Sequence, residues 1–264
     1  MKIDIKSLLR RVLPLKAREV VRMYWWLLTY YSSTLVTSWF VERKAEVHAY
    51  GSDPSLAGLV NQISDTNVLS PTRMCRVMTK YGSDKGRGWH NFTTLYSVLF
   101  KEFEDRSIRL FELGLSIPGR PGASLRGWRD LFPNASVYGA DIDRTVLFQD
   151  NRIETFYCDQ LDKASIHQLW SEPHLQNGVD IIIEDGLHTF EGNISFLENS
   201  IEHLRPGGIY VIEDIEHSTV TRWKAQLETI YPQRYPKYAF ALVLLPNASN
   251  AIDNNILVVR RSPE

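Results

Sequence analysis

From residue 108 to residue 261, short apolar runs that resemble β-strands alternate with runs of helical periodicity. The alternation predicts a mostly parallel sheet with helices on both faces, because parallel strands need helical crossovers. The last two strands have no helix between them, so we expect an antiparallel hairpin at one edge. The predicted fold is α/β and Rossmann-like, with seven strands. The predicted strands are 108–114, 136–141, 152–158, 179–184, 208–213, 238–245 and 255–261, and the helices are 124–132, a short one near Thr145, 163–170, 189–204 and 219–230.

A second organisational feature is the break at residues 50–69, where glycine, proline and small polar residues interrupt the pattern. We therefore expect an N-terminal helical segment at 1–70 and a catalytic domain at 71–264. Seven Lys or Arg residues lie within 1–22, and an uncharged run rich in Trp and Tyr follows at 23–41. This pattern is compatible with a helix on a membrane surface, with an aromatic surface that packs on the domain or another subunit, and with a membrane span.

Composition restricts the class of protein. The formal net charge of −1 argues against a nucleic-acid partner, since binding to a duplex needs clustered basic charge. Only two cysteines occur, Cys75 and Cys158, and they form no CxxC pair. A bridge between them remains open, but this usage favours a cytoplasmic protein, with the inner face of the membrane as an alternative location.

Three strand ends carry residues suited to a nucleotide-like ligand. A glycine-rich turn follows the first strand, beginning Glu112-Leu113-Gly114, and can bring backbone amides close to a ligand. The turn lacks the GxGxxG pattern of dinucleotide-binding enzymes, which disfavours a dehydrogenase. Asp141 and Asp159 follow the next two strands; each is suited either to a ligand hydroxyl or amine or to capping a helix.

The fourth and fifth strand ends each carry two adjacent carboxylates, Glu184-Asp185 and Glu213-Asp214. Neighbouring strands lie about 4.8 Å apart, so the four groups would repel one another unless the pairs diverge. A divalent cation such as Mg²⁺, which prefers oxygen ligands, would remove that penalty. His188 lies three residues beyond Asp185 and suits a general base. Capping of the following helix is the alternative, but the position of His188 beside the acidic residues favours the base.

These residues also support a resemblance. The segments 184–188 and 204–214, together with 80–86 and 122–128, resemble metal-dependent sugar O-methyltransferases of antibiotic biosynthesis. His90, Thr93 and Tyr96 lie in the part of the chain that resembles the region before the family's first strand. The similarity covers roughly residues 78–216. Ser116, where many methyltransferases have glycine, and Glu184, where this family often has Asp, depart from the pattern.

The resemblance implies a class I methyltransferase fold, S-adenosylmethionine as donor and a divalent cation such as Mg²⁺ as cofactor. It implies cation ligation by Asp185, Glu213 and Asp214, with His188 and Asp185 as the catalytic residues. The donor site is expected at Glu112, Gly114, Asp141 and Asp159, with Lys85 and Glu184 beside it. The expected acceptor is a sugar or glycan, and the chain is expected to form homo-oligomers. Two alternatives are a methyltransferase for a non-sugar small molecule and a donor-binding module without catalysis.

Overall fold

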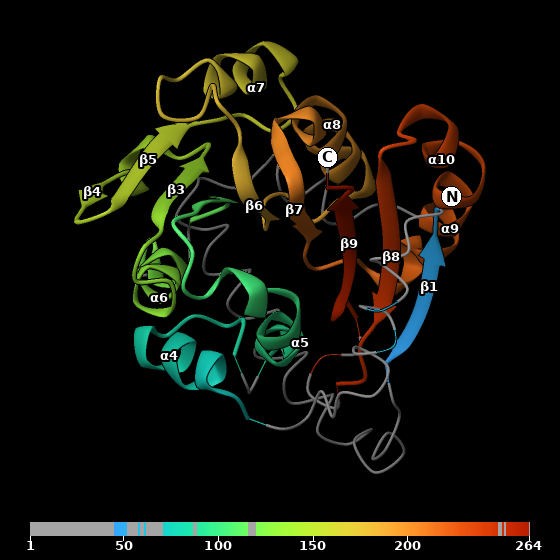
Figure 1. Cartoon of the computed structure of the whole chain (residues 1–264), viewed down its shortest axis with the longest axis horizontal. Coiled ribbons are helices and arrows are strands. Elements are labelled where there is room, and N and C mark those ends of the chain that lie inside the picture. The colour runs from blue at the N-terminus through green and yellow to red at the C-terminus, as the bar shows by residue number, and fades with distance from the viewer. Residues whose placement is uncertain are drawn as a thin grey trace, which may run out of the picture.

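A mixed sheet organises the chain, and the computed structural model describes residues 45–51, 58, 61, 71–86, 89–115, 120–247, 250 and 252–263 (Figure 1). The described residues form nine strands in the order β1-β8-β9-β7-β6-β2-β3-β5-β4. These strands are β1 (Glu46–Tyr50), β2 (Arg109–Leu113), β3 (Ser136–Asp141), β4 (Gln149–Asp150), β5 (Ile153–Tyr157), β6 (Val179–Glu184), β7 (Leu204–Ile212), β8 (Tyr238–Leu244) and β9 (Asn255–Arg261).

Five strands at the centre are parallel, namely β5, β3, β2, β6 and β7. From β2 the chain proceeds to β3 and β5 in one direction, and from β6 to β7 in the other. The winding therefore reverses between β2 and β6, and a crevice opens at that point beyond the carboxyl ends of the strands. This part of the fold agrees with the prediction from the sequence.

The sheet is wider than the predicted seven strands. β8 and β9 form the expected antiparallel hairpin, but the hairpin does not lie at the edge, because β1 pairs antiparallel with β8. An edge strand exposes unpaired backbone groups, and β1 covers those of β8. β1 lies within residues 1–70, the segment predicted to be helical. The two-residue strand β4 extends the opposite edge beside β5.

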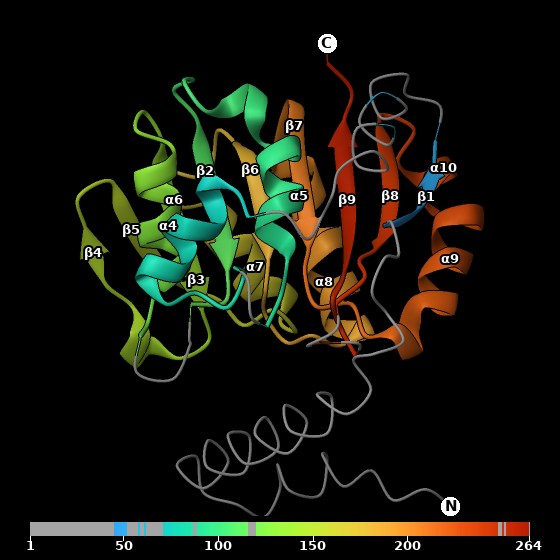
Figure 2. The same ribbon diagram turned by 90° about the horizontal axis from the view of Figure 1, so that it is seen from below.

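Helices cover both faces of the sheet (Figure 2). One face packs against α4 (Arg73–Tyr81), α5 (Phe92–Leu99) and α6 (Ala123–Leu131). The other packs against α7 (Lys163–Trp170), α8 (Phe190–Ser200), α9 (Val220–Thr229) and the short α10 (Tyr231–Arg234). Alternate residues of each buried strand point to opposite faces, so Ile181 and Ile183 contact the first layer and Ile182 the second. No helix or strand was predicted from the sequence in the region of α4 and α5.

Local side-chain caps start several of these helices. The Thr72 hydroxyl accepts a hydrogen bond from the Cys75 amide at α4, Asp162 accepts from Ala164 at α7, and Thr189 accepts from Gly192 at α8. Thr189, and not His188, is therefore the cap of α8. The side chain of His188 remains available for the crevice.

Two expectations concern features beyond the sheet. Cys75 and Cys158 are both buried and free, so they form no disulfide with each other. Among the described residues, no helix has the length and apolar character to cross a membrane. The basic segment and the aromatic run of 1–41 lie outside the described residues, and the helical prediction for them stays a prediction.

Candidate active site

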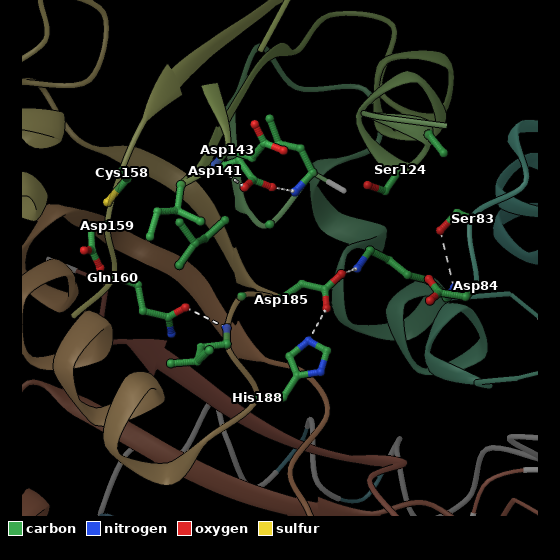
Figure 3. Close-up of a pocket in the computed structure, with 18 of the residues that line it drawn as sticks. Ser83, Asp84, Ser124, Asp141, Asp143, Cys158, Asp159, Gln160, Asp185 and His188 are labelled. Atoms are coloured by element: carbon green, nitrogen blue, oxygen red, sulfur yellow. Dashed lines mark hydrogen bonds and ion pairs between the residues drawn. The ribbon is translucent and has the colours of Figure 1, made fainter. Parts of the chain in front are cut away.

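A cavity of about 390 Å³ lies at the point where the winding of the sheet reverses (Figure 3). The ends of β2, β3, β5 and β6 form its walls, and the loop before α5 closes one side. Its lining residues are 83–85, 113–115, 123–124, 141–143, 158–161 and 185–188. Gly114, Asp141, Asp159, Lys85, Asp185 and His188 are thus together at one cavity. Glu112 and Glu184, also predicted for the donor site, do not line it.

Gly114 allows the ends of β2 and β6 to approach closely. Its φ of +92° is a conformation that L side chains rarely adopt, and an added Cβ would lie 1.9 Å from the Asp185 carbonyl oxygen. The Asp185 amide in turn donates to the Leu113 carbonyl oxygen at 2.9 Å. Glycine is therefore required here for the geometry of the crevice, whether or not it also contacts a ligand.

Asp141 is fixed by backbone amides at the mouth of the cavity. The Leu115 amide donates to Oδ2 at 2.8 Å, and the Asp143 amide donates to Oδ1 at 2.9 Å. Each carboxylate oxygen can accept a further hydrogen bond, so Asp141 remains able to bind ligand hydroxyls. Asp143 instead accepts from the amide and hydroxyl of Thr145 and caps the turn at 144–146. The capping alternative thus applies to Asp143 and not to Asp141.

Asp159 and two apolar side chains, Ile142 and Leu161, line another part of the cavity. Asp159 accepts a hydrogen bond from the Leu161 amide at 2.9 Å. Ile142 and Leu161 are 60% and 56% exposed although both are apolar, and both line the cavity. Exposed large apolar side chains at a concave site favour a flat apolar ligand surface. Asp159 provides a polar group beside that surface.

Lys85 lines the cavity and joins three carboxylates. Its Nζ is 3.3 Å from Glu112 Oε1, 2.5 Å from Asp185 Oδ2 and in direct contact with Glu213 Oε2. The lysine side chain is 2% exposed. Burial alone would lower its pKa, but the charges of Asp185, Glu112 and Glu213 raise the pKa well above its usual value. Lys85 is therefore a buried ammonium at neutral pH.

Glu112 is held from both sides. Ser124 donates to Oε1 at 2.7 Å, and the Trp128 indole donates to Oε2 at 2.5 Å. Burial and the charge of Asp185 raise its pKa, although Lys85, Ser124 and Trp128 oppose the shift. Glu112 thus contacts Lys85 and does not itself line the cavity.

Glu184 is likewise buried beneath the cavity wall. Its Oε1 accepts from Gln160 Nε2 at 2.9 Å, and Gln160 Oε1 accepts from the Leu187 amide at 2.7 Å. Burial raises the pKa of Glu184 to about 7. The side chain fixes Gln160 and the turn at 185–187, both of which line the cavity.

His188 bridges two of the carboxylates predicted to bind a cation. Its Nε2 is 3.0 Å from Asp185 Oδ1 and 3.2 Å from Asp214 Oδ2. Burial would lower its pKa, but the charges of Asp214 and Asp185 outweigh burial and raise the pKa to about 10. His188 and Asp214 both have a φ of +53°, a strained conformation for residues other than glycine that often occurs at functional sites.

These groups fit a divalent cation. Ligand atoms of Asp185, His188 and Asp214 lie within 4.8 Å of one another, and the buried Asp214 Oδ1 accepts no hydrogen bond. Burial and the charges of Asp185 and Asp253 raise the pKa of Asp214 to about 6, against the opposing charges of His188 and His90. A cation would relieve that repulsion. Glu213 lies beside this group, but its two oxygens contact Lys85 and the Tyr96 hydroxyl.

Several residues of the site received no role from the sequence. Tyr96 of α5 donates to Glu213, Gln160 orders the turn after β6, and His90 approaches Asp214. The segment 80–96 was used only for its resemblance to a family. The uncharged run at 92–99, which contains Phe92, Leu95, Tyr96 and Leu99, was a usable signal that this segment packs against the sheet.

Comparison with known proteins supports the resemblance. The chain is 34% identical over 142 residues to an 8-demethyl-8-α-L-rhamnosyl tetracenomycin-C 2′-O-methyltransferase of Streptomyces olivaceus, covering 53% of this chain and 36% of that protein. It is 32% identical over 163 residues to demethylmacrocin O-methyltransferase of Streptomyces fradiae, covering 61% of this chain and 38% of that protein. The chain therefore spans less than half the length of these relatives. No protein-family model matches it.

Solved structures establish the fold. The MycE methyltransferase of the mycinamycin pathway, solved with Mg, SAH and mycinamycin VI, superposes with a TM-score of 0.56 at 22% identity. The match covers 81% of this chain and 64% of that one. The fold is accordingly the Rossmann-like fold of class I methyltransferases, as predicted from the sequence.

Proposed function

We propose that this chain transfers a methyl group from S-adenosylmethionine to a hydroxyl of a sugar or glycan, with the help of a divalent cation. One observation carries the proposal. Asp185 and His188 line the cavity at the crevice, and together with Asp214 they also form the group that could hold a cation, called the acidic cluster below. A donor in the cavity and an acceptor at the cluster would therefore be adjacent. Holding both reactants in one crevice is a large part of the catalysis of group transfer.

The donor assignment follows from the cavity wall. Asp141 would accept hydrogen bonds from the ribose hydroxyls, and Asp159 would accept one from the adenine amino group. The adenine ring would lie between Ile142 and Leu161, whose exposed apolar surface it would cover. Gly114 gives the ligand access to the backbone of the turn. Glu112 and Glu184 would support this site from below, through Lys85 and Gln160.

Catalysis would depend on Asp185 and His188, which line the cavity, together with Glu213 and Asp214 beside them. Asp185, Glu213 and Asp214 would hold a divalent cation, which lowers the pKa of a bound hydroxyl when it is present. His188 would accept the proton of the acceptor hydroxyl. The hydroxyl oxygen would then bond to the methyl carbon in line as the sulfur–methyl bond of the donor breaks and S-adenosylhomocysteine leaves. The carboxylates that keep His188 protonated are those that would bind the cation, so cation binding favours the neutral imidazole.

The sugar acceptor is proposed from the relatives, whose names specify methylation of rhamnosyl tetracenomycin, demethylmacrocin and mycinamicin VI. The test is a methyl-transfer assay against a panel of glycosides and glycans, with EDTA and with Mg²⁺ restored. We expect turnover on a glycosylated acceptor, loss in EDTA and recovery with Mg²⁺. Asp214→Asn should lack turnover but still bind donor, because Asp214 does not line the cavity.

Full turnover in EDTA would refute the role of the cation. Thermal stabilisation by S-adenosylmethionine without turnover on any acceptor would instead support a donor-binding module. Turnover on non-glycosylated small molecules alone would support methyltransferase activity but refute a sugar or glycan as the acceptor.

We also propose that residues 1–45 mediate contact with anionic lipid at the inner membrane face. The basis is sequence alone: seven basic residues precede a run of Trp and Tyr. Basic residues near such a surface contribute about 1 kcal/mol each. Co-sedimentation of the full chain with anionic vesicles should be strong at low salt and weak at high salt. Lack of pelleting at low salt, with loss of oligomers on deletion of 1–45, would indicate a subunit interface instead.

A further inference from the structure

His90 lies on the side of Asp214 opposite to His188. It precedes α5, is 3% exposed, and its Nε2 is 3.4 Å from Asp214 Oδ1. His188 Nε2 is 3.2 Å from the other oxygen, Oδ2. Asp214 therefore has one histidine at each carboxylate oxygen. Only His188 lines the cavity, so His90 has no role in the chemistry proposed above.

The His90 ring is held in place by its neighbours. It stacks on Phe92 with ring centroids 4.4 Å apart and an interplanar angle of 23°. Its Nδ1 lies 3.3 Å from Asn254 Oδ1 and 3.4 Å from Asn250 Nδ2. The ring plane and the direction of Nε2 are therefore both fixed.

Asn250 offers a hydrogen-bond donor to His90 Nδ1, and Asn254 offers an acceptor to the same atom. In the neutral ring with a proton on Nε2, Nδ1 accepts from the Asn250 amide; in the protonated ring, Nδ1 donates to the Asn254 oxygen. In both states the nitrogen that carries the proton, Nε2, lies 3.4 Å from Asp214 Oδ1, within ion-pair distance. The remaining tautomer would leave the Nε2 lone pair beside a carboxylate and is disfavoured. A proton therefore stays on the His90 nitrogen nearest Asp214 in either charge state.

The connection between β8 and β9 supplies this arrangement and also braces the backbone beside Asp214. Asn254 Nδ2 donates to Asn91 Oδ1 at 2.7 Å and to the Leu245 carbonyl oxygen at 3.2 Å, which orients its oxygen toward His90. Asn255 Nδ2 donates to the Ile215 carbonyl oxygen at 2.8 Å, and the Ile215 amide donates to the Asn255 carbonyl oxygen at 3.0 Å. The strained backbone at Asp214 is thus held on its C-terminal side.

We propose that His90, oriented by the β8–β9 connection, is a positioning residue that fixes Asp214 for binding of the divalent cation. The inference rests on the cation site of the proposed function and deepens it. Groups that orient metal-ligating side chains typically change metal affinity 10–100-fold when removed. Asp214 needs such a partner because its other oxygen faces a second histidine and its backbone is strained.

The experiment compares two substitutions of the same residue. His90→Phe keeps a ring on Phe92 but removes the donor at Asp214, whereas His90→Gln keeps an N–H near the position of Nε2. Calorimetric titration of the full chain with Mg²⁺ gives the affinity, and titration with S-adenosylmethionine is the control. We expect His90→Phe to weaken Mg²⁺ binding by roughly 10–100-fold and His90→Gln to retain most of it. Donor affinity should be unchanged in both.

A purely structural role would predict a different result, in which donor affinity and melting temperature fall with Mg²⁺ affinity in both variants. Should His90→Phe fail to fold, Asn254→Ala gives a second measurement, with a smaller loss of Mg²⁺ affinity expected. Unchanged Mg²⁺ affinity in the folded variants would overturn the role of His90 but not the cation site. Lack of Mg²⁺ binding by the wild-type chain would overturn both. Two ions per chain would also overturn the inference, since His90, Asp214 and Asp253 would then bind a second cation.

Discussion

Lys85 Nζ lies 2.5 Å from Asp185 Oδ2, although one hundred residues separate the two in the sequence. The contact joins the segment before α5 to the end of β6, and both residues line the cavity. The same Lys85 ammonium also contacts Glu112, which lies in β2, and Glu213, which follows β7, so it connects the two carboxylates. The proposed donor site and the proposed cation site thus share one buried positive charge.

Removing that charge should destabilise the protein. Lys85→Met leaves three carboxylates buried around an apolar side chain, and breaking a buried ion pair from one side costs about 3–5 kcal/mol. The free energy of unfolding from urea denaturation should fall by that order. Lys80→Met is the matched control, since Lys80 is exposed and 3.7 Å from Asp130; such surface pairs contribute about 0–1 kcal/mol. Equal effects of the two substitutions would contradict the account of Lys85.

A second prediction separates the two acidic residues after β3. Asp141→Ala should weaken S-adenosylmethionine binding by about 1–3 kcal/mol, the range for lost hydrogen bonds to a charged group. Asp143→Ala should leave the affinity nearly unchanged, because the Asp143 carboxylate, although at the cavity, accepts its hydrogen bonds from the amide and hydroxyl of Thr145. Calorimetry on both variants is the measurement. The reverse order of affinities would assign the ribose to Asp143.

Glu184 gives a prediction about stability and pH. Its folded pKa of about 7 lies above the unfolded value of 4.5 because the group is buried. The stability associated with Glu184 is therefore fully present below pH 4.5 and is lost as the pH rises through 7. Glu184→Gln preserves an oxygen for Gln160 Nε2 and cannot ionise. The variant should match the wild type near pH 4.5 and be more stable by roughly 1–3 kcal/mol at pH 8.5. A stability difference that does not change with pH would show that the pKa of Glu184 is the same in the folded and the unfolded protein.

The part of the site that could be predicted from the sequence consists of the residues at the ends of the parallel strands. Asp141, Asp185 and Asp214 each follow a buried parallel strand, and such ends meet at one edge of a sheet, so their grouping follows from strand order. Lys85 and Tyr96 reach the same place through packing of α5 across the sheet, which no local periodicity specifies. The side chain of Glu112 could not be placed from the sequence either, because its direction depends on Ser124 and Trp128 of α6.

The strand β1 was missed for a related reason. Its five residues, Glu46–Tyr50, have no long apolar run, and two of them are exposed. What places them in the sheet is the unpaired edge of β8, nearly 200 residues later. Local sequence predicts the central strands well because they are buried on both faces. Edge strands depend on long-range pairing that composition does not reveal.

The last prediction concerns His188 as the base. It must be neutral to accept a proton, so the turnover rate should fall as the pH decreases through its pKa. Without a cation, Asp214 and Asp185 hold that pKa near 10; a cation on the same carboxylates should lower it toward the ordinary value of about 6.5. The acid limb of the pH–rate profile should therefore move to higher pH when Mg²⁺ is reduced below saturation. His188→Gln should remove the limb and reduce turnover by roughly 10²–10⁴, whereas His174→Gln, at an exposed histidine paired with Glu154, should have no effect. If the acid limb of the pH–rate profile persists in His188→Gln, or does not move with the Mg²⁺ concentration, another group accepts the proton.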